Sequence, residues 1–134
     1  MTNILTLYRP IGLKEYELIE KLDFRAFPPR LDWQPILYPV LNYEYAVQIA
    51  RNWNTRDAAS DYIGFVTAFD VDAVYLSQFE EQVDGGSMHR ELWIPAERLG
   101  EFNAHIVEQI RILAIFYGDN YNGKRDFMVD ELQK

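Results

Sequence analysis

The stretch that most constrains the fold is the sequence YIGFVTAFDV at residues 62–71. It is rich in β-branched and aromatic residues, which favour strands. Successive side chains of a strand point to opposite faces of a sheet, and here both sets are largely apolar. The stretch therefore predicts a central strand with packed layers on both of its faces. Gly64 within it predicts either a β-bulge or a place of close backbone approach.

The rest of the chain alternates short apolar stretches with helical patterns. Asn42 is a favourable helix N-cap, and the apolar residues that follow it with helical spacing end at Trp53, which we expect in the core. Residues 110–116 are β-branched and predict a strand, with a helix as the alternative. The predicted elements are strands at 4–8, 36–41, 62–71, 89–94 and 110–116, and helices at 12–23, at 43–53, after Asp72 and after Pro95.

This pattern predicts an α+β fold with a mainly antiparallel sheet of about five or six short strands and about three or four helices. A chain of 134 residues is one domain of ordinary size. We expect residues 1–118 to form that domain. Residues 119–134 are polar and contain an Asn-Gly turn, so we expect a tail that is mobile or loosely packed.

The composition limits the classes of site and location. The chain has no cysteine, which excludes disulfides, thiolate metal sites and a cysteine nucleophile. Its first residues lack the apolar core of a signal peptide. No apolar run approaches the roughly 20 residues of a membrane span. These features favour a cytoplasmic protein that does not enter a membrane.

The net charge of −8 is unevenly distributed along the chain. Residues 1–60 are neutral overall, with seven basic and seven acidic side chains, whereas residues 61–134 hold six and fourteen. Such a field repels a phosphate backbone, so general nucleic-acid binding is not expected. A local pocket built from the first half could still bind an anion.

The richest chemistry in the sequence lies at residues 89–94. A strand there would put His89, Glu91 and Trp93 on one face. Glu91 could then be a catalytic carboxylate, with His89 polarising a bound group and Trp93 packing against a ring. The alternative is an ordinary solvated strand face. The spacing alone favours this alternative.

Arginines supply the candidate anion sites. Arg9 ends the first predicted strand and could bind a phosphate or carboxylate through its planar guanidinium, or could equally pair with Glu15. Arg25 and Arg30 flank the Phe-Pro-Pro corner at 27–29, which could bind an anion or a partner. For this corner we favour a stiff loop whose phenylalanines fill the core.

Several common catalytic motifs are absent from the sequence. His89 and His105 are the only histidines, and they form neither HxxxH nor HExxH, so a zinc hydrolase is not expected. The chain also lacks GxGxxG and a P-loop. No metal site is predicted.

The order of the predicted elements resembles that of ADP-ribosyltransferase domains. The resemblance lies in three segments. LYRP at 7–10 resembles the first strand of those domains, YIGFVT at 62–67 the middle strand, and RELWIP at 90–95 the strand with the catalytic glutamate. The phrases LYRP, FRAFPPR and ELWIPAE also resemble those of small bacterial proteins, some of which carry a label mentioning ADP-ribosylation and crystallin. The resemblance covers about residues 4–116.

This resemblance implies NAD as a substrate, with no metal. Arg9 would hold the phosphates or the ribose of NAD. Glu91 would stabilise the positive charge that develops on the ribose as nicotinamide leaves. Thr67 and Tyr62 are both candidates for the contact from the middle strand.

Two positions depart from the family pattern. His89 stands two residues before Glu91, where many protein-modifying members have Glu or Gln. No aromatic clamp for nicotinamide is clearly assigned, although Tyr45 or Tyr38 could serve. Either departure could mean a different acceptor or an inactive enzyme.

The resemblance therefore predicts a transferase-like protein whose Arg9 and Glu91 point into one cleft. The alternatives come from other classes of function. One is a non-enzymatic protein-interaction module that uses the Phe-Pro-Pro corner and the acidic second half. The other is a binder of a small ligand, such as a nucleotide, that uses the same cleft without chemistry.

Overall fold

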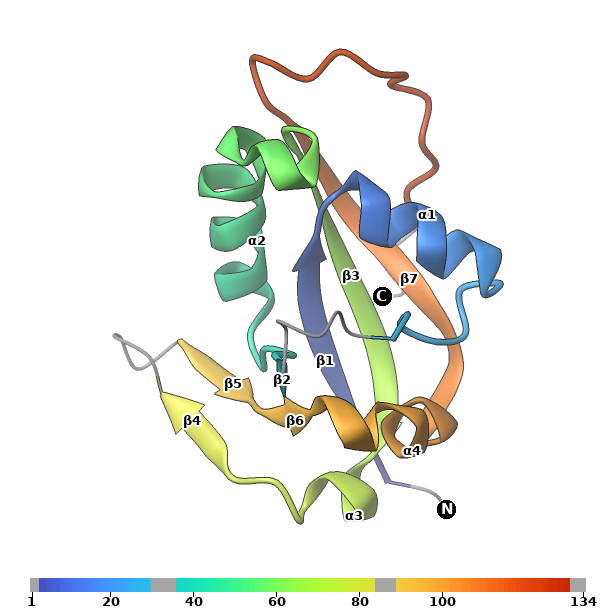
Figure 1. The fold of residues 1–134 in the computed structure, drawn as a ribbon. Helices are drawn as coiled ribbons and strands as arrows, with labels where there is room; N and C mark the ends of the chain where they lie inside the picture. The colour runs from blue at the N-terminus through green and yellow to red at the C-terminus, as the bar shows by residue number, and fades with distance from the viewer. Residues whose placement is uncertain (1–2, 30–35, 84–88, 131–134) are drawn as a thin grey trace.

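The computed structural model describes residues 3–29, 36–83 and 89–130. This part of the chain contains four α-helices and seven strands, and its paired strands are antiparallel. The predicted α+β class is thus confirmed (Figure 1). The helices are α1 (Leu13–Lys21), α2 (Tyr43–Asn52), α3 (Ala73–Leu76) and α4 (Leu99–Ala104), with 3-10 turns at Asn54–Arg56, Ala58–Ser60 and Ala96–Arg98. The strands are β1 (Ile4–Ile11), β2 (Ile36–Leu37), β3 (Ile63–Asp72), β4 (Glu81–Val83), β5 (Arg90–Leu92), β6 (Ile94–Pro95) and β7 (Ile106–Tyr117).

The central strand is β3, which pairs with β1 on one side and with β7 on the other. Val40 extends this sheet past β1, because it bridges Tyr8 of β1 and Glu91 of β5. The Val40 backbone exchanges hydrogen bonds of 2.9 and 2.7 Å with Tyr8. β4 then pairs with β5. The order across the surface is therefore β4, β5, Val40, β1, β3 and β7.

Both faces of β3 are covered, as its sequence predicted, and its first seven residues are all buried. One face packs against α1, α3 and α4, and the other packs against α2. Phe65 and Phe69 point to the first face, and Val66 points to the second. Gly64 is the predicted point of close approach, because a Cβ added there would lie 2.6 Å from the carbonyl oxygen of Ala50 in α2.

Asn42 caps α2 as predicted, and its side chain accepts a hydrogen bond of 3.2 Å from the Tyr45 amide. The prediction that Trp53 lies in the core is wrong, because the side chain is 59% exposed. α2 ends at Asn52, and Trp53 is the residue that caps its end. The chain turns there into a 3-10 turn, so position 53 no longer follows the buried stripe of the helix.

The segment from 89 to 94 forms two short strands in place of the single predicted one, with a break at Trp93. β5 pairs with β4, whereas β6 pairs with β2. The double glycine at 85–86 lies outside the described residues. Residues 106–117 form the long strand β7, so residues 110–116 are a strand and not the alternative helix.

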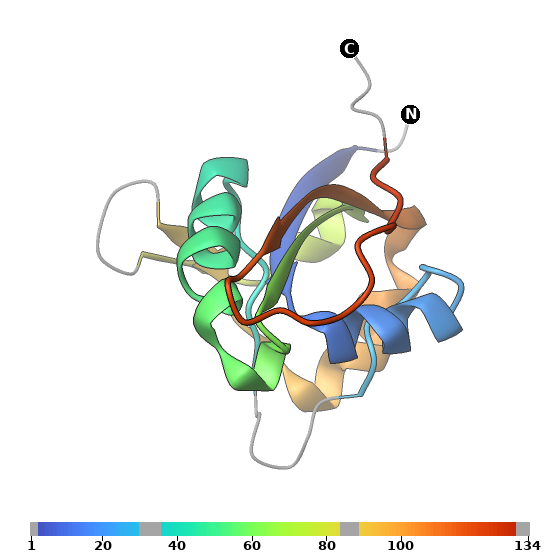
Figure 2. The same ribbon diagram turned by 90° about the horizontal axis from the view of Figure 1, so that it is seen from above.

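The segment after β7 returns along the molecule without regular structure (Figures 1 and 2). The sequence predicted a mobile or loosely packed tail here. The described part, residues 119–130, is attached at three points. Tyr121 is buried, Phe127 packs edge-on against Tyr16 and Phe65, and Asp130 exchanges two hydrogen bonds with the Ile112 backbone.

The Phe-Pro-Pro corner fills the core, which is the interpretation favoured from the sequence. Phe27 is 1% exposed and packs edge-on against Phe69, with ring centroids 4.8 Å apart. The Asn103 side chain holds the Phe27 backbone with hydrogen bonds of 2.9 and 3.0 Å. The corner is thus fixed to both β3 and α4.

Candidate functional site

Glu91 is the one charged side chain that is buried among the residues that the structure describes. Its Oε1 accepts a hydrogen bond of 2.8 Å from the indole Nε1 of Trp93. Its Oε2 accepts one of 3.3 Å from the Tyr45 hydroxyl on α2. Both donors are neutral. No lysine or arginine in the described part of the chain pairs with this carboxylate.

His89 lies beside this carboxylate. Its ring stacks on that of Tyr45, with centroids 4.5 Å apart and planes 14° apart. Its Nε2 lies 3.1 Å from Oε1 of Gln48, one turn further along α2. These contacts put His89 and Glu91 on the side of β5 that faces α2, and the Trp93 indole reaches the same carboxylate.

Arg9 forms an ion pair with Glu15 of α1. Its Nε and one terminal nitrogen lie 2.8 and 2.9 Å from the two carboxylate oxygens, so the pair is bidentate. Both side chains are mostly buried. Of the two roles that the sequence left even for Arg9, pairing with Glu15 is the one that the structure contains. The fully buried Thr67 donates its hydroxyl to the Arg9 carbonyl at 2.8 Å.

Arg9 and Glu91 lie on opposite faces of the sheet. Residues paired directly across neighbouring strands point to the same face, so Glu91 shares its face with Val40 and Tyr8. Arg9 follows Tyr8 in β1 and therefore points to the other face, where Thr67 is its partner on β3. This arrangement does not provide the shared cleft that the transferase resemblance implies.

Tyr62 also lies apart from Glu91. It sits in the turn before β3 with a φ of 62°, and its ring packs against the larger core cluster. Its carbonyl accepts a hydrogen bond of 2.8 Å from the Gly118 amide. Of the six predicted site residues, three gather at β5 and α2. These are Glu91, His89 and Tyr45, whereas Arg9, Thr67 and Tyr62 do not join them.

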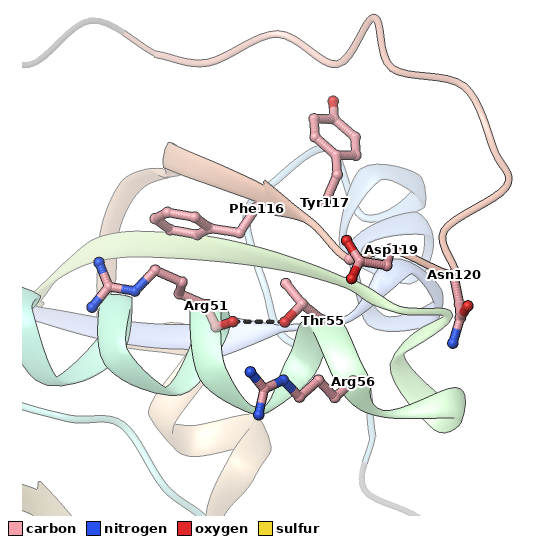
Figure 3. A pocket seen from close by; sticks show the side chains of 8 residues that line it. Arg51, Thr55, Arg56, Phe116, Tyr117, Asp119 and Asn120 are labelled. Carbon is pink, nitrogen blue, oxygen red and sulfur yellow. Dashed lines mark hydrogen bonds between the residues drawn. The ribbon is translucent and has the colours of Figure 1, made fainter.

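A pocket of about 330 Å³ lies at the other end of α2 (Figure 3). Its walls come from the end of α2, the 3-10 turn that follows, the end of β7 and the first residues after that strand. The lining residues are Arg51, Thr55, Arg56, Phe116, Tyr117, Gly118, Asp119 and Asn120. The lining thus includes two arginines, the Phe116 ring and one carboxylate, whereas the Tyr117 ring points away from the arginines (Figure 3).

The two pocket arginines differ from the other arginines that the structure describes. Five of those form ion pairs with carboxylates, and Arg125 lies over the rings of Tyr117 and Tyr121. Within the described residues, neither Arg51 nor Arg56 has a carboxylate or ring partner. The chain has an excess of acid, so two arginines without such partners in one pocket lining are an unusual concentration of positive charge.

The sequence analysis did not single out this pocket. Little in the sequence indicates the pocket, because Arg51 and Arg56 lie in a helix end and a polar turn, where exposed arginines are common. The other wall lies about 60 positions later, at Phe116 and Gly118. Gly118 brings the walls together, since its backbone packs directly on Thr55. Both arginines come from the first half of the chain, where the sequence allowed a local anion pocket, but the wall from Phe116 to Asn120 comes from the second half.

Arg9 offers a test of its structural role. Replacing Arg9 with methionine leaves Glu15 without its partner and should destabilise the fold by about 1–3 kcal/mol, below the range for fully buried pairs because both groups retain some exposure. Urea unfolding would measure the change. The double variant Arg9→Met, Glu15→Met should recover part of the loss, because it leaves no unpaired charge. A single variant as stable as the wild type would contradict the structural role.

Other features of the described residues bear on the class of protein. No helix among them is long and apolar enough to cross a membrane. They contain no group of three or more His, Asp or Glu side chains arranged to hold a metal ion. Arg30 lies outside the described residues, and Arg25 is exposed beside Asp23. Comparison with protein-family models, curated proteins and solved structures finds no match to any of them.

Proposed function

We propose that this protein is a binding module for a small anionic ligand, which it holds between Arg51 and Arg56. The observation that carries the proposal is one pocket lined by two arginines that have no carboxylate or ring partner among the residues that the structure describes. Guanidinium groups match phosphate and carboxylate oxygens in geometry and charge. The small-ligand binder considered from the sequence used the cleft of Arg9 and Glu91, whereas this proposal places the ligand at the end of α2.

The position of the pocket makes its affinity depend on these two side chains. A helix C-terminus carries partial negative charge, which by itself disfavours an anion. The net charge of −8 acts in the same direction. Arg51 and Arg56 must therefore supply the attraction, and Phe116 offers an aromatic ring beside Arg51 (Figure 3). A phosphorylated ligand with a flat ring, such as a nucleotide, fits this combination.

The proposal predicts that Arg51→Gln and Arg56→Gln each weaken binding of ADP or inorganic phosphate by about tenfold or more, since a charge-assisted hydrogen bond contributes about 1.5–3 kcal/mol. Isothermal titration calorimetry would measure the affinities. Arg25→Gln removes the same charge from a site outside the pocket and should leave them unchanged. Equal affinities for the wild type and both pocket variants would refute the proposal.

In the same experiment, a change at Asp119 should strengthen phosphate binding instead of weakening it. Its carboxylate lines the pocket and repels an anion. Asp119→Asn should therefore tighten phosphate binding severalfold, as expected for one partly exposed charge. Asp126→Asn is the control, because it removes an exposed carboxylate outside the pocket lining. If the anion binds elsewhere, Asp119→Asn should raise the affinity no more than Asp126→Asn does.

The NAD-dependent transferase activity remains a separate prediction from the resemblance. The pairing of Arg9 with Glu15 on the face opposite to Glu91 weighs against it. Adding NAD to the same titrations, with an assay for released nicotinamide, tests it directly. Release by the wild type that is lost in Glu91→Gln would establish the enzyme. Binding of NAD without release would leave the protein as a binding module.

A further inference from the structure

We propose that Glu91, together with the rings of Trp93 and Tyr38, binds an arginine or lysine side chain of a basic partner protein. This surface is separate from the anion pocket, because Glu91 lies on β5, Trp93 follows that strand and Tyr38 follows β2, whereas the pocket lies at the end of α2. The sequence suggested a protein-interaction module that uses the Phe-Pro-Pro corner and the acidic second half. The side chains around Glu91 offer a different recognition site, with defined chemistry.

The first support is the state of the carboxylate. A buried charge is costly unless an opposite charge pairs with it. Glu91 is 8% exposed and has hydrogen bonds from Trp93 and Tyr45, yet no described lysine or arginine reaches it. The five ion pairs of the described residues all use other carboxylates. A cation supplied by a partner would complete this site.

The second support is the pair of rings beside the carboxylate. Trp93 is 44% exposed and Tyr38 is 40% exposed, and the rings meet edge to face with centroids 6.0 Å apart. The Trp93 indole is fixed by its hydrogen bond to Glu91. A cation over such a ring is attracted to its face, and arginine is the most frequent cation in this role. Ring and carboxylate can therefore bind the same guanidinium or ammonium group.

The third support is the charge of the whole chain. All of the excess acid lies in residues 61–134, the half that contains Glu91 and Trp93. A negative field steers basic partners and repels acidic ones. We therefore assign the occupant as a basic segment of another protein. A lone small cation would lack the additional charges that this field attracts.

The test is an NMR titration with a short peptide of alternating glycine and arginine, observed at the Trp93 indole N–H. Binding should shift this resonance, and a matched peptide with citrulline in place of arginine should not shift it. Glu91→Gln keeps the shape of the side chain and removes its charge, so we expect the affinity to fall about tenfold. Glu97→Gln removes the same charge from an exposed neighbour and should leave the affinity close to that of the wild type.

A second variant tests whether a loss of affinity in Glu91→Gln comes only from misfolding. Trp93→Leu removes the aromatic face at an exposed position and, followed at backbone amide resonances because the indole is gone, should weaken peptide binding about fivefold, as loss of a partly exposed cation–π contact predicts. Thermal unfolding of each variant would establish that it is folded. The proposal is overturned if millimolar peptide leaves the Trp93 resonance unchanged. It is also overturned if folded Glu91→Gln binds the peptide as well as the wild type does.

Discussion

Replacing Gly118 with alanine is expected to destabilise the protein by about 3 kcal/mol, at the upper end of the usual cost of overpacking. An added Cβ would lie 2.0 Å from the Thr55 carbonyl oxygen and 2.8 Å from that of Tyr62. Both neighbours are backbone atoms, which cannot rotate away as a side chain could. The end of β7 would have to separate from the 3-10 turn that follows α2, and the pocket would be distorted as well.

Gly100 provides the matched control for this substitution. It lies in α4, and a Cβ added there would meet nothing within 4 Å. Gly100→Ala should leave stability unchanged or raise it by about 0.5–1 kcal/mol, because alanine favours a helix over glycine. Urea unfolding of the two variants beside the wild type measures the difference. Equal changes in the free energy of unfolding for Gly118→Ala and Gly100→Ala would contradict the close packing described at Gly118.

The largest loss of stability is expected for Phe69→Ala, at about 3–5 kcal/mol. Phe69 is fully buried on β3 and packs edge-on against Phe27 and Phe102, with centroids 4.8 and 6.2 Å away. Truncation removes the ring that joins the central strand to the Phe-Pro-Pro corner and to α4. A domain of this size has a total stability of about 5–15 kcal/mol, so the variant would lose a large share of it.

Phe69→Leu separates loss of volume from loss of the aromatic contact. A leucine retains most of the buried apolar surface and should cost about 1–2 kcal/mol. Equilibrium unfolding, followed by far-ultraviolet circular dichroism, would measure both variants. A cost below 1 kcal/mol for the alanine variant would mean that this part of the core is not packed as described.

The sequence predicted the elements better than their arrangement. β3 could be found because a strand with apolar side chains on both faces has few other places than the centre of a sheet. α2 could be found from Asn42 and the spacing after it. Trp53 was misplaced because helical spacing gives no indication that the helix ends one residue earlier.

The candidate site could be predicted only in part, for a physical reason. Alternation within one strand predicted His89, Glu91 and Trp93 on one face, and these side chains do gather at the Glu91 carboxylate and Tyr45, although the strand breaks at Trp93. It contains no information on the register between strands, and a shift of one residue reverses which face a side chain occupies. Arg9 was linked to Glu91 by the order of elements alone. The bridge through Val40 puts Tyr8, and not Arg9, on the face of Glu91.

The measurement that tests the central proposal most directly is an NMR titration of ADP observed at the arginine Nε–H groups. Binding between Arg51 and Arg56 should shift the resonances of these two side chains together. Those of Arg9 and Arg111, which are held in ion pairs, should stay in place. A shift at Arg9 without one at Arg51 or Arg56 would contradict the proposed site, and no shift at any arginine with millimolar ADP would contradict the binding of nucleotides.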